Sequence, residues 1–168
     1  MQAAELKSLQ APLKDLYRQD GKTALVTLTA EGRIGDDVTC SVATAKALVE
    51  AGLHPATGGS GVHACSGDML LQALVACAGV TLNAVATALG LEIGDATVKA
   101  EGDLDFRGTL GVAKEVPVGF CDIRLTFDIK GKLDDDQKAS LIKLTERYCV
   151  VYQTLRNPPP IAVTTRWA

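Results

Sequence analysis

The feature that most constrains this chain is an uncharged run from Met69 to Leu91. Ser66, just before the run, is a residue type that caps helices, and Asp68 would lie in the first turn, where the helix dipole favours an acidic side chain. Gly90 offers a stop, since glycine readily adopts the left-handed conformation that ends helices. We therefore predict one long helix, which either spans a membrane or lies at the centre of a globular fold.

Polar residues inside the run distinguish these two environments. No Lys or Arg flanks the run as an interfacial anchor. Its uncharged polar side chains are Gln72, Thr81, Asn83 and Thr87. This pattern favours a buried central helix over a membrane span, so no membrane partner is expected.

The N-terminal quarter of the chain carries one helix pattern and two strand patterns. Leucines at one face of a predicted amphipathic helix make residues 1–20 a docking arm, in which Pro12 either splits the helix or sets its first turn; they are Leu6, Leu9, Leu13 and Leu16. Residues 22–30 and the segment VTCSVAT are rich in strand formers, and EGRIGDD between them suits a hairpin turn. We predict two strands here.

The C-terminal half contains a second strand pattern and a second helix. TVKAEGDLDF is β-rich, and apolar and polar residues alternate from Cys121 to Lys130, which is typical of a half-buried antiparallel strand. Asp134 is placed to cap a helix from Asp135 to about Leu155. Its apolar stripe is Leu141, Leu144, Tyr148, Val151 and Leu155. NPPP ends this helix, and IAVTTRW is predicted as a last strand.

These elements predict an α+β fold with two long central helices packed on antiparallel sheet. The length of 168 residues fits a single domain over residues 1–168. The formal charge of −3, with both signs interspersed, excludes the basic surface that nucleic acid requires.

The number and spacing of the cysteines indicate the cellular compartment and limit the kinds of site that they can form. The five cysteines are an odd number at irregular spacing, which disfavours a disulfide framework or a zinc site. The N-terminus carries Glu5 and Lys7 and lacks the apolar stretch of a secretory signal. We predict a reducing cytoplasmic location, where thiols stay free.

Two of the cysteines lie on the two predicted long helices, where both thiols could face one helix–helix contact. They are Cys77 and Cys149. Taken alone, each is most simply a buried packing residue. The sequence assigns no role to Cys40, Cys65, Cys121, His54 and His63.

The segments around these two cysteines are similar to those of a known family. GDMLLQALVACAGVTL resembles the first-cysteine helix of the OsmC/Ohr family of osmotically inducible and organic-hydroperoxide-resistance proteins, and ERYCVVYQTL resembles its second-cysteine motif. ATGGSG ahead of the first helix and the GR turn after the first strand also fit. The resemblance extends from about Lys22 to the C-terminus and implies the OsmC-like fold, with an intertwined homodimer.

The resemblance also implies a thiol-dependent peroxidase that reduces organic hydroperoxides. Cys77 matches the peroxidatic cysteine, Cys149 the resolving cysteine, and Arg33 the turn arginine that stabilises the thiolate and the departing alkoxide. A thiolate that cleaves an O–O bond becomes a sulfenic acid, which a second thiol captures as a disulfide. The expected partners are a second copy of the chain, a small hydrophobic hydroperoxide and an external dithiol reductant, with no cofactor and no metal.

Two positions depart from the family pattern. The family's hydroperoxide-resistance branch has a glutamate ten residues before the first cysteine to hold the arginine, and this chain has Gly67 there, followed by Asp68. Proline usually follows the second cysteine, and here Val150 does. These departures leave open a second interpretation, a non-catalytic binding or redox-sensing protein of the same fold with an apolar pocket for a small hydrophobic ligand. The paired cysteines favour the enzyme.

Overall fold

The computed structural model describes residues 3–35, 39–42 and 51–167, and the side chains of residues 8–27 and 51–167. A four-stranded antiparallel sheet with the order β2-β1-β3-β4 forms one layer. The strands are β1 (Leu25–Gly35), β2 (Thr39–Val42), β3 (Ala96–Asp105) and β4 (Phe120–Ile129). Helices and antiparallel strands alternate irregularly along the chain, which confirms the predicted α+β class.

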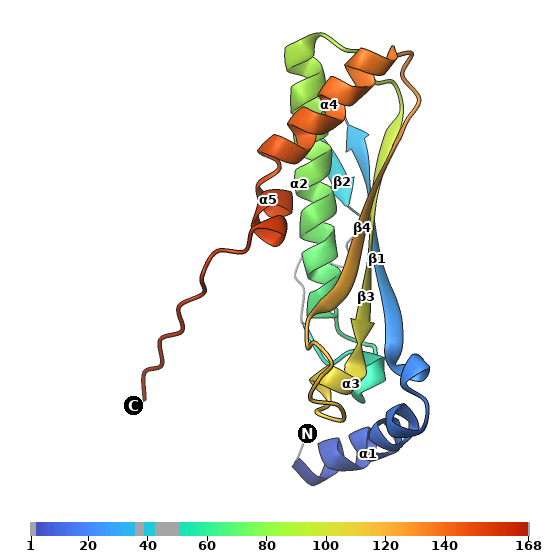
Figure 1. Ribbon diagram of the computed structural model, residues 1–168, viewed down its shortest axis with the longest axis vertical. Coiled ribbons are helices and arrows are strands. Elements are labelled where there is room, and N and C mark those ends of the chain that lie inside the picture. Colours follow the sequence, from blue (N-terminus) through green and yellow to red (C-terminus); the bar gives the residue numbers. More distant parts are fainter. Residues whose placement is uncertain (1–2, 36–38, 43–50, 168) are drawn as a thin grey trace.

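Three helices lie beside this sheet (Figure 1). The longest, α2 (Ser66–Leu89), runs along the sheet. Next, α4 (Asp135–Tyr148) crosses α2 near its C-terminal end, and α5 (Val150–Arg156) lies beside α2 nearer its middle. The predicted stop of α2 is confirmed, because Gly90 has a left-handed φ of 65°. The predicted Asp134 cap of α4 is also confirmed, as part of a capping box.

The start of α2 differs by one residue from the prediction. Cys65 occupies the N-cap position and Ser66 is already helical, so Ser66 is not the cap. The Cys65 side chain makes no capping hydrogen bond, and Asp68 in the first turn supplies the negative charge that the helix dipole favours.

Buried side chains of α2 recur at intervals of three and four residues and form the centre of two hydrophobic cores. The first core joins the sheet and Cys149; its buried members are Leu71, Leu74, Val75, Ala78, Val98, Ala100 and Cys149. The second joins α4; its buried members are Leu82, Val85, Ala86, Ile93, Ala96 and Leu141. By length and composition α2 could cross a membrane, and 44% of its most apolar window is buried against the rest of the chain.

A third core lies between the N-terminal helix, which is at the bottom of Figure 1, and the adjoining end of the sheet; its buried members are Tyr17, Ala24, Phe106 and Leu110. Its helices are α1 (Ala3–Gln19), the 3₁₀ turns η1 (Gly21–Ala24) and η2 (Pro55–Thr57), and α3 (Phe106–Thr109). The Tyr17 hydroxyl donates to the carbonyl of Ala56 at 2.7 Å and so ties α1 to η2. Pro12 lies in the middle of α1, where it neither splits the helix nor sets its first turn, so this expectation is wrong although a helix does form over Ala3–Gln19.

Two strand predictions need correction. β1 continues to Gly35, so most of the segment expected to form a turn is paired strand, and residues 36–38 lie outside the described residues. In β4 the register against β3 shifts between Asp103 and Leu104, and Phe120 rather than Cys121 packs into the core. This bulge explains why Cys121 is exposed although the alternation predicted it on the apolar face.

Two predictions near the C-terminus are wrong. The helix expected from residue 135 to 155 is broken at Cys149 into α4 and α5. Residues 161–167 form no strand and are exposed, with Ile161, Val163 and Trp167 each near 90% exposure. Strand propensity alone does not make a strand, because the segment follows three prolines away from the body and meets no sheet edge in the described part of the chain (Figure 1).

Candidate functional site

Cys77 is held in the middle of α2, at the border between its buried and exposed faces. Leu74, one turn earlier, is fully buried, and so is the next residue, Ala78. Cys77 itself is partly exposed and packs against the first core. The helix thus presents this thiol at the surface of the core, where a small molecule can reach it.

Cys149 lies at the junction of α4 and α5 and is 1% exposed. Its backbone is extended, with φ −72° and ψ 106°, and it is at once the C-cap of α4 and the N-cap of α5. Its N–H donates to the carbonyl of Thr145 at 2.9 Å, and its Sγ accepts from the N–H of Tyr152 at 3.5 Å. The thiol therefore caps the start of α5, as a Ser, Thr, Asp or Asn side chain usually does at this position.

The helix is broken at Cys149 although Val150, and not proline, follows this cysteine. A continuous helix would pair the carbonyl of Glu146 with the N–H of residue 150. Here that carbonyl accepts from the side-chain amide of Gln153 at 2.7 Å, and the carbonyl of Cys149 accepts from the Gln153 N–H at 2.9 Å. The Gln153 side chain thus replaces one helical hydrogen bond at the junction, and the regular backbone hydrogen bonds of α5 begin at the Cys149 carbonyl.

The structure brings Cys77 and Cys149 into interaction. The pKa of the Cys149 thiol is raised to about 11: burial raises it most, the N–H of Tyr152 lowers it, and interaction with Cys77 raises it. Both thiols are free. Of the three predicted site residues, these two meet where α2 passes the junction of α4 and α5.

Arg33 lies in β1, opposite Ser41 of β2 and Thr97 of β3, and not in the turn where it was expected. Its side chain lies outside the described residues. Two other arginines stand near Cys149 in sequence. Arg147 lies over the ring of Tyr148, 5.5 Å from its centroid, and Arg156 donates from Nη1 to the hydroxyl of Tyr152 at 2.8 Å.

Gly67, at the position where the family's hydroperoxide-resistance branch has a glutamate, lies in the first turn of α2. Asp68 is half-buried; burial raises the pKa of its carboxyl, and the neighbouring His54 imidazole partly offsets this rise. His54 has a structural role, because its Nδ1 accepts from the N–H of Ala56 at 3.0 Å and its ring stacks on Phe106 with centroids 4.9 Å apart. Asp68, the residue after Gly67, is therefore an electrostatic neighbour of His54.

The other cysteines have separate surroundings. Cys65 packs against the first core from the start of α2, and Cys121 is exposed on β4. The side chain of Cys40 lies outside the described residues. Within residues 3–35, 39–42 and 51–167, no group of three or more His, Cys, Asp and Glu side chains comes together to hold a metal ion.

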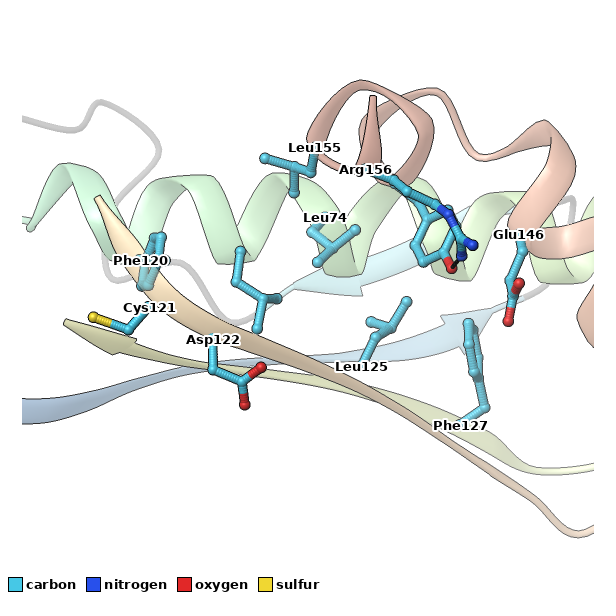
Figure 2. A pocket seen from close by; sticks show the side chains of 11 residues that line it. Leu74, Phe120, Cys121, Asp122, Leu125, Phe127, Glu146, Leu155 and Arg156 are labelled. Atoms are coloured by element: carbon cyan, nitrogen blue, oxygen red, sulfur yellow. Dashed lines mark hydrogen bonds between the residues drawn. The ribbon is translucent and has the colours of Figure 1, made fainter. Parts of the chain in front are cut away.

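A cavity of about 560 Å³ opens between β4, α2 and α5 (Figure 2). Its apolar lining is Leu74, Phe120, Ile123, Leu125, Phe127 and Leu155. Charged groups stand around it: Asp122, Glu146 and Arg156. Figure 2 shows Leu155 and Arg156 reaching into the cavity from α5, opposite Leu125 and Phe127 on β4.

Sequence reasoning missed the residues that build the junction and the cavity wall. Gln153, four residues after Cys149, and the Tyr152–Arg156 pair at the same spacing are the only signals it could have used. Both were hidden because a continuous helix was expected there.

Comparison with known proteins places this arrangement in a family. The sequence profile of OsmC-like proteins matches residues 58–164, most of the chain and both cysteines. The chain belongs to the OsmC-like family. None of the curated proteins matches this OsmC-like chain.

Two solved structures share the OsmC-like fold. An OsmC-like hydroperoxide resistance protein from Jannaschia sp. CCS1 is 18% identical with a TM-score of 0.59, over 82% of this chain and 91% of that one. The OsmC-like protein from Mycoplasma pneumoniae is 17% identical with a TM-score of 0.54, over 80% and 86%. The fold predicted from the sequence resemblance is thereby confirmed.

Proposed function

We propose that this OsmC-like protein is a thiol-dependent peroxidase that reduces organic hydroperoxides with Cys77 and Cys149. The observation that carries the proposal is the interaction of the two thiols, one partly exposed and one buried. The name of the Jannaschia relative, a hydroperoxide resistance protein, supports the same reaction class.

The reaction has two thiol steps. The Cys77 thiolate attacks one oxygen of the hydroperoxide; an S–O bond forms, the O–O bond breaks, and the leaving alkoxide takes a proton to become the alcohol. The Cys149 thiolate then attacks the sulfur of the Cys77 sulfenic acid, an S–S bond forms, and water leaves. An external dithiol restores both thiols by disulfide exchange.

The order of the two cysteines follows from their environments. Cys149 is 1% exposed and its pKa is raised, so at neutral pH it is overwhelmingly a neutral thiol. Cys77 is the more accessible sulfur. A peroxide therefore meets Cys77 first, and Cys149 acts only after the sulfenic acid has formed beside it.

Arg33 is proposed as the cation that favours the Cys77 thiolate and the departing alkoxide. Since Gly67 offers no carboxylate to tether it, the arginine must be held by other groups or move. Arg33→Ala should lower the rate constant for Cys77 oxidation in stopped-flow measurements while the circular dichroism spectrum is unchanged. An unchanged rate constant would remove Arg33 from the mechanism.

A second copy of the chain is proposed to complete the site. An exposed apolar stripe runs along α2, with Cys77 in its middle; at helical spacing its members are Leu70, Ala73, Val80 and Ala84. A homodimer would cover this stripe and shield Cys77 from water. Val80→Glu should convert the dimer to a monomer by light scattering and slow peroxide turnover, and a wild-type monomer at micromolar concentration would contradict the proposal.

The decisive experiment measures peroxide loss with a dithiol reductant, for cumene hydroperoxide and hydrogen peroxide. Cys77→Ser should abolish consumption, and Cys149→Ser should accumulate a sulfenic acid that dimedone traps. Cys65→Ser is the matched control, because that thiol lies twelve residues before Cys77, at the start of α2, and makes no capping hydrogen bond. If Cys77→Ser consumes peroxide at the wild-type rate, the peroxidase proposal is wrong.

The cavity supports one alternative, a non-catalytic protein that binds a small hydrophobic molecule. Its apolar lining and volume suit such a ligand, and Gly67 weakens the arginine clamp. Binding without peroxide consumption by any of the four proteins would favour this alternative.

A further inference from the structure

The cavity wall formed by α5 depends on very little structure of its own. Tyr152, Leu155 and Arg156 all line the cavity from this one helix, and the Arg156–Tyr152 hydrogen bond links two of them. The helix has seven residues, fewer than an isolated helix needs to be stable in water. Its geometry therefore depends on its cap and on packing.

The sulfur atom that caps α5 is the same atom that would form the disulfide with Cys77. Cys149 Sγ accepts the N–H of Tyr152, the same residue whose side chain lines the cavity. A disulfide fixes the sulfur about 2.05 Å from its partner, with a dihedral near 90°. Sγ already interacts with Cys77, and we expect a covalent bond to that sulfur to draw Sγ further toward α2 and so to lengthen and weaken the hydrogen bond from the Tyr152 N–H in the first turn of α5.

We propose that the cavity binds an uncharged apolar molecule in the dithiol state, and that the Cys77–Cys149 disulfide releases it by removing the cap of α5. This rests on the proposed function for the disulfide itself. Cys77 and Cys149 lose two protons and two electrons, and an organic hydroperoxide accepts them to become an alcohol and water. The bound apolar molecule is then released as the wall loosens.

The charges around the cavity favour an uncharged ligand. Asp122 is paired with Arg124 at 2.7 Å, so Glu146 and Arg156 remain as one charge of each sign, and the Arg156 Nη1 is already bonded to the Tyr152 hydroxyl. A carboxylate on the ligand would therefore gain no net attraction there. The apolar floor on β4 and Leu74 on α2 supply the affinity.

The test measures binding of N-phenyl-1-naphthylamine, an uncharged fluorescent probe, to the full chain in both redox states. The disulfide is made with diamide and verified by thiol counting, so peroxide chemistry is not needed. Reduced protein should bind about tenfold more tightly than the disulfide form. By linkage, saturating probe should then raise the reduction potential of the pair by about 30 mV.

Variants at the cap separate its role from oxidation itself. Cys149→Ser keeps a capping oxygen and should bind like reduced protein, with or without diamide, whereas Cys149→Ala should bind as weakly as the disulfide form. Cys77→Ser keeps the Cys149 cap and should not respond to diamide. Leu125→Trp fills the cavity and should lose binding in every state, with circular dichroism verifying that it folds.

Three results would overturn the coupling: equal probe affinity in both redox states, Cys149→Ala binding like Cys149→Ser, or no Cys77–Cys149 disulfide after diamide. Probe affinity that survives Leu125→Trp in folded protein would also overturn the assignment to this cavity. Failure of the peroxidase proposal can be told apart from failure of the coupling. If the protein does not consume peroxide, the peroxidase proposal is wrong, but the ratio of probe affinities between reduced and diamide-oxidised protein does not change.

Discussion

Replacing Val150 with proline tests the account of the junction most directly. Val150 is the first residue of α5 and is 71% exposed, and proline is well suited to a first helical position. Cys149 already has the extended conformation that proline imposes on its predecessor. The carbonyl of Glu146, which a continuous helix would offer to residue 150, is taken by Gln153.

The expected magnitude follows from these observations. Proline restricts the unfolded chain, and at a compatible position this stabilises a protein by about 0.4–1 kcal/mol. The exposed Val150 side chain loses little packing on replacement. Val150→Pro should therefore raise the free energy of unfolding by about 0.4–1 kcal/mol.

The assay is urea denaturation of the reduced protein at one fixed concentration. Val151→Pro is the matched control, because the Val151 side chain packs against the first core and proline there disfavours the helical conformation of Val150 before it. It should destabilise the protein by about 1–3 kcal/mol. If Val150→Pro destabilises as much as Val151→Pro, the helix is not interrupted in the way described.

Three further predictions concern other parts of the chain. Hydrogen bonds from Arg124 and Thr27 lower the pKa of Asp103 to about 2, so its contribution to stability is complete above pH about 4 and is lost as pH falls toward 2; Asp103→Asn should flatten acid denaturation in that window. Gly102→Ala would place a Cβ 2.5 Å from the ring of Phe120 and should destabilise the protein by about 1–3 kcal/mol in the same urea assay. Because the pKa of Cys149 is raised to about 11, disulfide formation from the Cys77 sulfenic acid should accelerate about tenfold per pH unit from pH 7 to 10 in stopped-flow measurements, and a flat profile would contradict that pKa.

Local signals predicted the elements whose stability is largely local. The uncharged run and Gly90 predicted α2, because an apolar helix and its left-handed stop are both determined by nearby residues. Asp134 predicted the start of α4 for the same reason, since a cap acts within one turn. The meeting of Cys77 with Cys149 was also anticipated, from their places on the two long helices.

The junction at Cys149 could not be predicted in this way. The apolar stripe continues at helical spacing from Leu141 through Val151 to Leu155, so periodicity carries no trace of the break. The break depends on the Gln153 amide reaching Glu146 and on the buried Cys149 sulfur. Both depend on tertiary packing, which no local pattern encodes.

The same limit explains the C-terminal segment and β4. A strand needs an edge to pair with, and the propensity of residues 161–167 says nothing about whether one is present. In β4, strict alternation hid the bulge that exposes Cys121 and turns Phe120 inward. One inserted residue reverses the face of its neighbours without changing composition.

The absence of proline after Cys149 has a consequence for the coupling between the thiols and the cavity. With Val150, the first turn of α5 is ordered by hydrogen bonds, one of which is accepted by the Cys149 sulfur and is expected to weaken when the disulfide forms. Proline at position 150 would fix the backbone φ of the first residue of α5 and so help to keep Tyr152 and Leu155 in the cavity wall after the disulfide forms. Val150→Pro should therefore bring the tenfold ratio of probe affinities between reduced and disulfide protein close to one, mainly by tightening the disulfide form. A ratio that stays near ten in this variant would show that the wall loosens by some route other than loss of the Cys149 cap.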